Sequence, residues 1–194
     1  MERDYQALPI RELGEAAGFH RPTQPPAARV TEASPALQVM TDLMRASPAT
    51  IRPQAPLAGA NQFMIARGVR LLLVADDREK VLGVITATDI LGERPMLAAT
   101  GRGLRRDELT VADIMTPAAQ VEVLSLADVE QARVGHVLET LRRAGRQHAL
   151  VLDADGMVRG IFSISQIARQ LGVPLPAGAE VARTFSEIAA ALSR

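Results

Sequence analysis

The 194-residue sequence contains no cysteine and no tryptophan, and aromatic residues make up only 3% of it. The absence of cysteine excludes disulfide bonds, thiol catalysis and thiolate zinc sites. The low aromatic content argues against binding of single-stranded nucleic acid by base stacking. Because Lys80 is the only lysine, mechanisms that need a Schiff-base or phosphate-loop lysine have almost nothing to use.

An excess of charge is missing as well. Lys and Arg together number 22, Asp and Glu also number 22, and the formal net charge is zero. Nucleic-acid-binding proteins usually carry a basic excess, so we expect no nucleic-acid partner. The longest strongly apolar run, residues 71–75, is far too short to span a bilayer, and the first residues lack the pattern of a secretory signal. We therefore expect a soluble cytoplasmic protein without a membrane partner.

An internal repeat is the main feature that the sequence does have. Residues 68–76 align with residues 145–153, and the alignment continues through the following β-rich segments at one constant offset. Each copy has the same order of predicted elements: a short strand, a helix, two strands joined by a tight turn, and a second helix. The first strand is expected near Thr50 and Ile51 in one copy, and near Val121 and Glu122 in the other.

Local signals place the ends of the predicted helices. Gly68 and Gly145 stand where glycine commonly ends a helix, and Thr88 and Ser165 are expected to cap the second helix of each copy. The second copy has extra residues around 126–133, between its first strand and its first helix.

Two pairs of motifs carry a family resemblance. The copies are preceded by Val39-Met40-Thr41 and Ile114-Met115-Thr116-Pro117, and their tight turns are followed by Gly83-Val84-Ile85-Thr86-Ala87-Thr88-Asp89 and Gly160-Ile161-Phe162-Ser163-Ile164-Ser165-Gln166. With these motifs, the chain resembles a tandem pair of cystathionine-β-synthase (CBS) domains, or Bateman module. The resemblance implies an α/β (α+β) fold of two βαββα repeats packed through their sheets. It also implies two clefts that commonly bind adenosine-containing ligands, and a homodimer.

We expect five segments along the chain. The C-terminal helix among them is predicted from the helical spacing of Val181, Phe185, Ile188 and Leu192. The segments are an N-terminal arm with a Pro-rich linker (1–35), a first CBS domain (36–95), an inter-repeat linker (96–110), a second CBS domain (111–172) and a C-terminal amphipathic helix (173–194).

The resemblance implies a nucleotide site in the first copy. Asp89 can accept hydrogen bonds from both hydroxyls of a ribose, and Thr86 can offer its hydroxyl to a phosphate. Thr50 and Ile51 match the family positions that hold the adenine edge, and Arg70 matches a phosphate-binding cation. The alternatives are a carboxylate that only caps its helix, an ordinary strand start and a surface arginine.

The second copy departs from the family pattern. Gln166 replaces the ribose-binding carboxylate, Val121 replaces the usual hydroxyl residue, and Glu122 adds a negative charge near the expected phosphate. A second site is therefore expected to bind more weakly, to bind a different ligand or to be vacant. Its candidate residues are Arg146, Gln147, His148, Ser163 and Gln166.

Neither a catalytic site nor a metal site is predicted. His20, His136 and His148 are widely spaced, and no nucleophile motif supports a serine hydrolase. We expect a non-catalytic regulatory module without an obligatory cofactor, which binds an adenine nucleotide or S-adenosylmethionine and signals to a separate protein partner. The alternative is a structural or interaction protein with degenerate, vacant sites.

Overall fold

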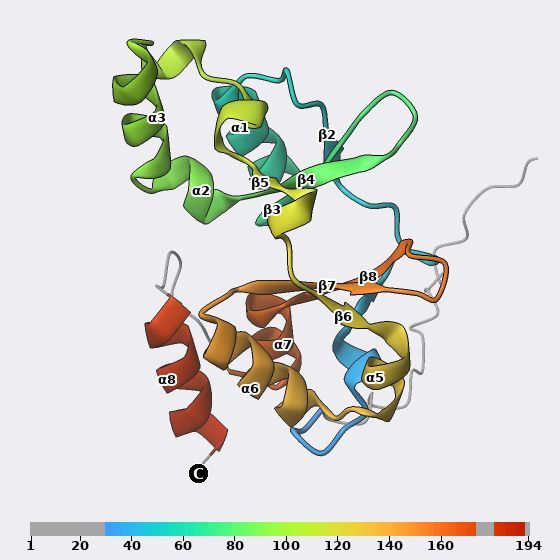
Figure 1. Cartoon of the computed structure of the whole chain (residues 1–194). Coiled ribbons are helices and arrows are strands. Elements are labelled where there is room, and N and C mark those ends of the chain that lie inside the picture. Colours follow the sequence, from blue (N-terminus) through green and yellow to red (C-terminus); the bar gives the residue numbers. More distant parts are fainter. Residues whose placement is uncertain (1–29, 174–180, 193–194) are drawn as a thin grey trace, which may run out of the picture.

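The computed structural model of the protein describes residues 30–173 and 181–192 (Figure 1). These residues form two four-stranded sheets, with strand orders β2-β3-β4-β5 and β1-β8-β7-β6. Figure 1 shows the two sheets in the middle of the molecule, with helices of the first repeat above and helices of the second repeat below. The expected mixed α/β fold of two repeats packed through their sheets is confirmed.

The strands are short. They are β1 (Thr41–Asp42), β2 (Thr50–Ile51), β3 (Leu71–Ala75), β4 (Val81–Thr86), β5 (Thr116–Pro117), β6 (Val123–Ser125), β7 (His148–Leu152) and β8 (Val158–Ser163). The α-helices are α1 (Leu57–Arg67), α2 (Ala87–Leu91), α3 (Arg94–Arg102), α4 (Val111–Ile114), α5 (Leu126–Gln131), α6 (Val134–Ala144), α7 (Ile164–Gln170) and α8 (Val181–Leu192). Three 3-10 turns are η1 (Ala36–Val39), η2 (Arg106–Glu108) and η3 (Ala118–Gln120).

The order β2-α1-β3-β4-α2 recurs as β6-α6-β7-β8-α7, with α5 inserted after β6. Gly68 and Gly145 end α1 and α6 in the left-handed conformation, as expected, with φ of 64° and 62°. The expected caps Thr88 and Ser165 are wrong. Because the helices begin directly after the strands, the N-caps of α2 and α7 are Thr86 and Ser163.

The first strand of the second copy also begins later than expected. Thr50 pairs in parallel with Leu73, and Val123 pairs in the same way with Leu150. Leu73 and Leu150 are equivalent in the repeat, so Val123, and not Val121, occupies the Thr50 position. The extra residues of the second copy form α5.

The two repeats exchange the short strands that precede them, β1 and β5, which we call the lead strands. Thr41 of β1 pairs with Ile161 of β8, and Thr116 of β5 pairs with Val84 of β4. Each lead strand therefore precedes one repeat along the chain but completes the sheet of the other. Asp42 on β1 also forms an ion pair with Arg159 on β8.

The hydrophobic cores follow the same exchange. Three residues of the segment 36–40 are buried with α6 and α7 of the second repeat, namely Ala36, Val39 and Met40. Three residues of the segment 109–114 are buried with α1 and α2 of the first repeat, namely Leu109, Val111 and Ile114. A third cluster lies between the sheets and consists of Leu71, Leu73, Val84 and Leu150.

The expected linker 96–110 is largely helical, because it contains most of α3 and the turn η2. The expected C-terminal helix is present as α8, in which Ile188 is 3% exposed and Phe185 packs against the second core. The side chains of Val181 and Leu192, and residues 1–29 of the expected arm, lie outside the described residues. No helix among the described residues is long and apolar enough to cross a bilayer.

Candidate functional site

Two clefts lie between the repeats. The Asp89 cleft, of about 500 Å³, joins the β4–α2 junction of the first repeat to the segments before β6 and β7 of the second. The Gln166 cleft, of about 340 Å³, joins the β8–α7 junction of the second repeat to the segments before β2 and β3 of the first. Leu71 and His148, which are equivalent in the repeat, line both clefts.

The Asp89 carboxylate is fixed by the start of α2. Its Oδ2 accepts hydrogen bonds from the backbone N–H of Thr86 at 2.8 Å and from the Thr86 hydroxyl at 2.7 Å. The backbone N–H of Asp89 donates to Thr86 Oγ1 at 3.2 Å, which completes a capping box. The capping role considered from the sequence is therefore present, and the same carboxylate also lines the cleft.

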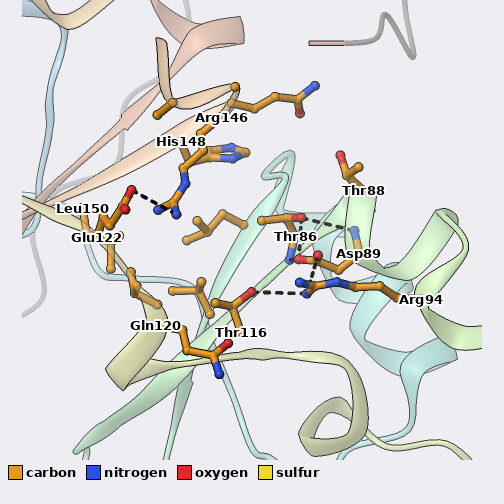
Figure 2. A pocket seen from close by; sticks show the side chains of 16 residues that line it. Thr86, Thr88, Asp89, Arg94, Thr116, Gln120, Glu122, Arg146, His148 and Leu150 are labelled. Atoms are coloured by element: carbon orange, nitrogen blue, oxygen red, sulfur yellow. Dashed lines mark hydrogen bonds and ion pairs between the residues drawn. The ribbon is translucent and has the colours of Figure 1, made fainter. Parts of the chain in front are cut away.

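Arg94 is a cleft residue that the sequence analysis missed. Its Nη1 donates to Asp89 Oδ1 at 2.9 Å, and to the Ile114 carbonyl and the Thr116 hydroxyl at 3.2 Å each. Figure 2 shows this guanidinium beside Asp89 and Thr116. Arg94 thereby ties the first repeat to the lead strand β5. It starts α3, a helix that begins at the end of the expected first domain and continues into the expected linker, and nothing in the sequence marked it as a site residue.

The opposite side of the Asp89 cleft comes from the second repeat. Arg146 forms an ion pair with Glu122 at 3.1 Å, and His148 lies near them (Figure 2). Gln147 also lines this cleft. Burial of the His148 imidazole, followed by the positive charge of Arg70, lowers its pKa from 6.5 to about 4. His148 is therefore neutral at pH 7 and offers one N–H donor and one acceptor.

The Gln166 cleft has a different set of polar groups. Gln166 Oε1 accepts a hydrogen bond from Thr41 on the lead strand β1 at 2.9 Å. The hydroxyls of Ser163 and Ser165 lie 3.0 Å apart. The remaining polar side chains of the lining are Ser47, Arg67, Arg70, His148 and Arg169.

The structure groups the expected site residues by cleft and not by repeat. Thr86 and Asp89 lie with Arg146, Gln147 and His148, whereas Arg70 lies with Ser163 and Gln166. Thr50 and Ile51 lie in neither cleft, because β2 faces a separate open groove that Met157 also lines. The exchange explains the regrouping, since each cleft takes its two sides from different repeats.

A protein-family model for the CBS domain matches the chain twice, at residues 39–95 and 111–172. Among solved structures, the chain is similar to an uncharacterized conserved protein from Pyrococcus horikoshii, with 22% identity, a TM-score of 0.56, and coverage of 77% of this chain and 100% of that chain. It is similar to CBSX2 in complex with AMP, with 20% identity, a TM-score of 0.51, and coverage of 70% and 94%.

A third similar structure is the CBS domain pair of protein MJ0100 in complex with 5′-methylthioadenosine and S-adenosylmethionine. Its identity is 21%, its TM-score is 0.50, and the match covers 70% of this chain and 98% of that chain. No curated protein matches the sequence. At these identities the structural similarity establishes the fold, and the two family matches, which together span more than half of the sequence, establish that this chain belongs to the CBS domain family.

Proposed function

We propose that the protein is a non-catalytic regulatory module that binds an adenosine-containing ligand between its two repeats. The observation that carries the proposal is the Asp89 cleft, in which a fixed carboxylate from one repeat faces Arg146, Gln147 and His148 from the other. The AMP complex of CBSX2 and the 5′-methylthioadenosine and S-adenosylmethionine complex of the MJ0100 pair support this class of ligand.

Asp89 keeps hydrogen-bonding capacity for a ribose. A carboxylate has about four acceptor positions, and Asp89 uses two on Oδ2 with Thr86 and one on Oδ1 with Arg94. One ribose hydroxyl can therefore bind Oδ1 without breaking these contacts. A second hydroxyl requires Arg94 to move, which couples ligand binding to the contact between Arg94 and β5.

The same coupling supports a regulatory role. A ligand that contacts both sides of the cleft binds best at one relative position of the repeats, and binding shifts the population toward that position. The change is then read by a separate protein partner. We propose that this interaction with the partner protein takes place in the cytoplasm, as expected from the sequence.

The test is a calorimetric titration of the full chain with AMP, ADP, ATP, S-adenosylmethionine and 5′-methylthioadenosine. The first variant is Asp89→Asn, which keeps one acceptor oxygen for the capping box but loses the charge. Asp113→Asn is the matched control, because Asp113 forms the same box with Thr110 and the same ion pair with an arginine, Arg102, but lines neither cleft.

We expect at least one of these compounds to bind, with an affinity about tenfold lower in Asp89→Asn and unchanged in Asp113→Asn. A missing charge-assisted hydrogen bond of roughly 1.5–3 kcal/mol corresponds to a change of this size or larger. Equal losses in both variants would show that the effect comes from the helix cap, and would contradict binding of the ligand by Asp89.

A second function is supported by one observation: in each cleft, some of the polar side chains are already bonded to a neighbouring side chain. Asp89 is paired with Arg94, Glu122 with Arg146, and Gln166 with Thr41. Such internal pairing fits an interaction protein with degenerate sites, whose surfaces bind a partner protein. Absence of binding for all five compounds would favour this function.

A homodimer is part of the first proposal. Ile65 on α1 and Leu91 on α2 are 73% and 65% exposed on the helical face of the first repeat, while in the second repeat α8 packs against α7. Sedimentation of the purified chain is expected to show a dimer that dissociates more readily in the Ile65→Asp variant. A monomer at all concentrations would contradict this part of the proposal.

A further inference from the structure

The two clefts differ in the balance of their charged side chains. The Asp89 cleft contains two carboxylates and two guanidinium groups, which form the ion pairs Asp89–Arg94 and Glu122–Arg146. The Gln166 cleft is lined by three arginines, Arg67, Arg70 and Arg169, and by no Asp or Glu of the described part of the chain. Its formal charge is therefore positive, whereas the charges of the Asp89 cleft cancel.

None of the three arginines of the Gln166 cleft forms an ion pair with another described residue. Arg67 lies over the ring of Phe63, with 5.5 Å between its guanidinium carbon and the ring centroid, and this contact leaves its N–H donors available. The three residues belong to different places in the fold. Arg67 ends α1, Arg70 precedes β3, and Arg169 lies on α7 of the other repeat.

Guanidinium groups that form no ion pair within the protein are well suited to bind phosphate. An arginine can donate two parallel hydrogen bonds to phosphate oxygens, and a phosphate that binds here breaks no existing ion pair. In the Asp89 cleft, by contrast, an anion must compete with two carboxylates for the same arginines and is repelled by them. The hydroxyl groups of Ser47, Ser163 and Ser165 also line the Gln166 cleft and can donate further hydrogen bonds.

We propose that the Gln166 cleft is the anion site of this protein and binds a polyphosphate-bearing ligand through Arg67, Arg70 and Arg169. The Asp89 cleft then selects an adenosine compound with little negative charge. This inference rests on the proposed function and adds the class of ligand that each cleft takes. Of the alternatives that the sequence left open for the second site, it takes the binding of a different ligand, since the first repeat adds Arg67 and Arg70 to the Arg169 of the second.

The test uses calorimetric titrations of the full chain with ATP, adenosine and inorganic tripolyphosphate, each at low and at high salt. The first variant is Arg70→Gln, because glutamine already occupies the equivalent position, Gln147, in the other repeat. Arg169→Gln is a second variant, at an exposed site on α7. Arg146→Gln is the matched control, because it removes one arginine from the Asp89 cleft.

We expect tripolyphosphate to bind the unmodified chain, and ATP to bind at least tenfold more tightly than adenosine. Arg70→Gln and Arg169→Gln are each expected to lower the affinity for ATP and for tripolyphosphate about tenfold, and to leave the affinity for adenosine unchanged. Higher salt should weaken ATP binding but not adenosine binding. If Arg70→Gln lowers the melting temperature, its loss of binding can reflect loss of stability. The Arg169→Gln variant, at an exposed position, then decides whether the arginines bind the polyphosphate.

Two results would overturn the anion site: absence of tripolyphosphate binding, or a larger loss in Arg146→Gln than in Arg70→Gln and Arg169→Gln. Failure of the proposed function has a different signature. In that case, tripolyphosphate binds and depends on Arg70 and Arg169, but no adenosine compound binds more tightly than tripolyphosphate. Conversely, adenosine binding that depends on Asp89, without any gain from phosphates, would leave the proposed function intact and remove the anion site.

Discussion

At the scale of the residue, the turns that join β3 to β4 and β7 to β8 differ at one informative position. In both turns the side chain of an aspartate, Asp76 or Asp153, accepts backbone hydrogen bonds. Glu79 adopts a left-handed φ of 62° in the first turn, where the second has Gly156 with a φ of 76°. This conformation is strained for a residue with a side chain.

We expect Glu79→Gly to raise the free energy of unfolding by about 0.5–1 kcal/mol, because relief of the strain exceeds the entropy that glycine adds to the unfolded chain. The converse change, Gly156→Ala, should destabilise the protein by a similar amount. Denaturant titration of both variants checks the prediction. A loss of stability in Glu79→Gly would contradict the assigned strain.

His148 makes stability depend on pH. Its pKa in the folded protein is lowered to about 4 by burial and by Arg70, so the unfolded chain binds more protons between about pH 6.5 and pH 4. The free energy of unfolding therefore has its full value above pH 6.5 and decreases as the pH falls through this range, by roughly 3 kcal/mol at most.

The His148→Leu variant, which copies Leu71, should lose this dependence. Carboxylates with a lowered pKa, such as those of Asp113 and Glu139, also reduce stability on acidification, but they do so at lower pH and in both proteins. The informative quantity is thus the difference between variant and unmodified chain, measured by urea unfolding at pH 5 and pH 7. An equal decrease in both would contradict the prediction.

The residues of the candidate site could be predicted only in part. Motif and chemistry were enough to select Thr86 and Asp89, which lie together in one cleft. They were not enough to predict that Asp89 shares a cleft with Arg146, or that Arg70 shares a cleft with Gln166. That pairing depends on which repeat supplies the opposite wall, a property of tertiary packing that is absent from the local sequence.

At the scale of the element, the exchanged lead strands make strict demands on two glycines. A Cβ atom on Gly83 would lie 2.3 Å from the backbone oxygen of Thr116 in β5. A Cβ atom on the equivalent Gly160 would lie 2.3 Å from the Met40 Sδ atom. The first obstacle is backbone, whereas the second is a flexible side chain that can change its rotamer.

Gly83→Ala should therefore destabilise the protein by about 3 kcal/mol, and Gly160→Ala by about 1 kcal/mol, within the usual range for overpacking. Thermal unfolding of the two variants, compared at the same pH, measures the difference. Equal effects, or a larger effect at Gly160, would show that β5 moves away from Gly83 without difficulty.

Elements with a strong periodic pattern were predictable, and the exchange of the lead strands was not. The apolar spacing of α6 and the continuous apolar run of β3 are local signals. The lead strands β1 and β5 have two residues each, so their extended pairing depends on the strand beside them. Their Met-Thr motifs marked the start of each copy, but nothing in them specified the sheet of the opposite repeat.

At the scale of the whole molecule, the exchange makes the two repeats interdependent. Met40 completes the core of the second repeat and Leu109 that of the first. We therefore expect one cooperative unfolding transition, in which the calorimetric and van't Hoff enthalpies agree.

A fragment of residues 111–172 lacks β1 and the buried segment 36–40, and should not fold alone. Far-UV circular dichroism of this fragment, beside the full chain, checks the second half of the prediction. Two separate calorimetric transitions, or a fragment with a cooperative melt, would contradict the interdependence.

The lead strands also bear on how such a chain can arise. A gene that encodes a single repeat yields a protein whose sheet lacks its edge strand, and a second molecule must supply it, as in domain swapping. Duplication and fusion of the gene replace that encounter between two molecules with a contact inside one chain, at the high effective concentration that a linker provides. Once fused, the copies no longer need to be identical, and Asp89 and Gln166, or Leu71 and His148, can diverge while the exchange of lead strands is retained.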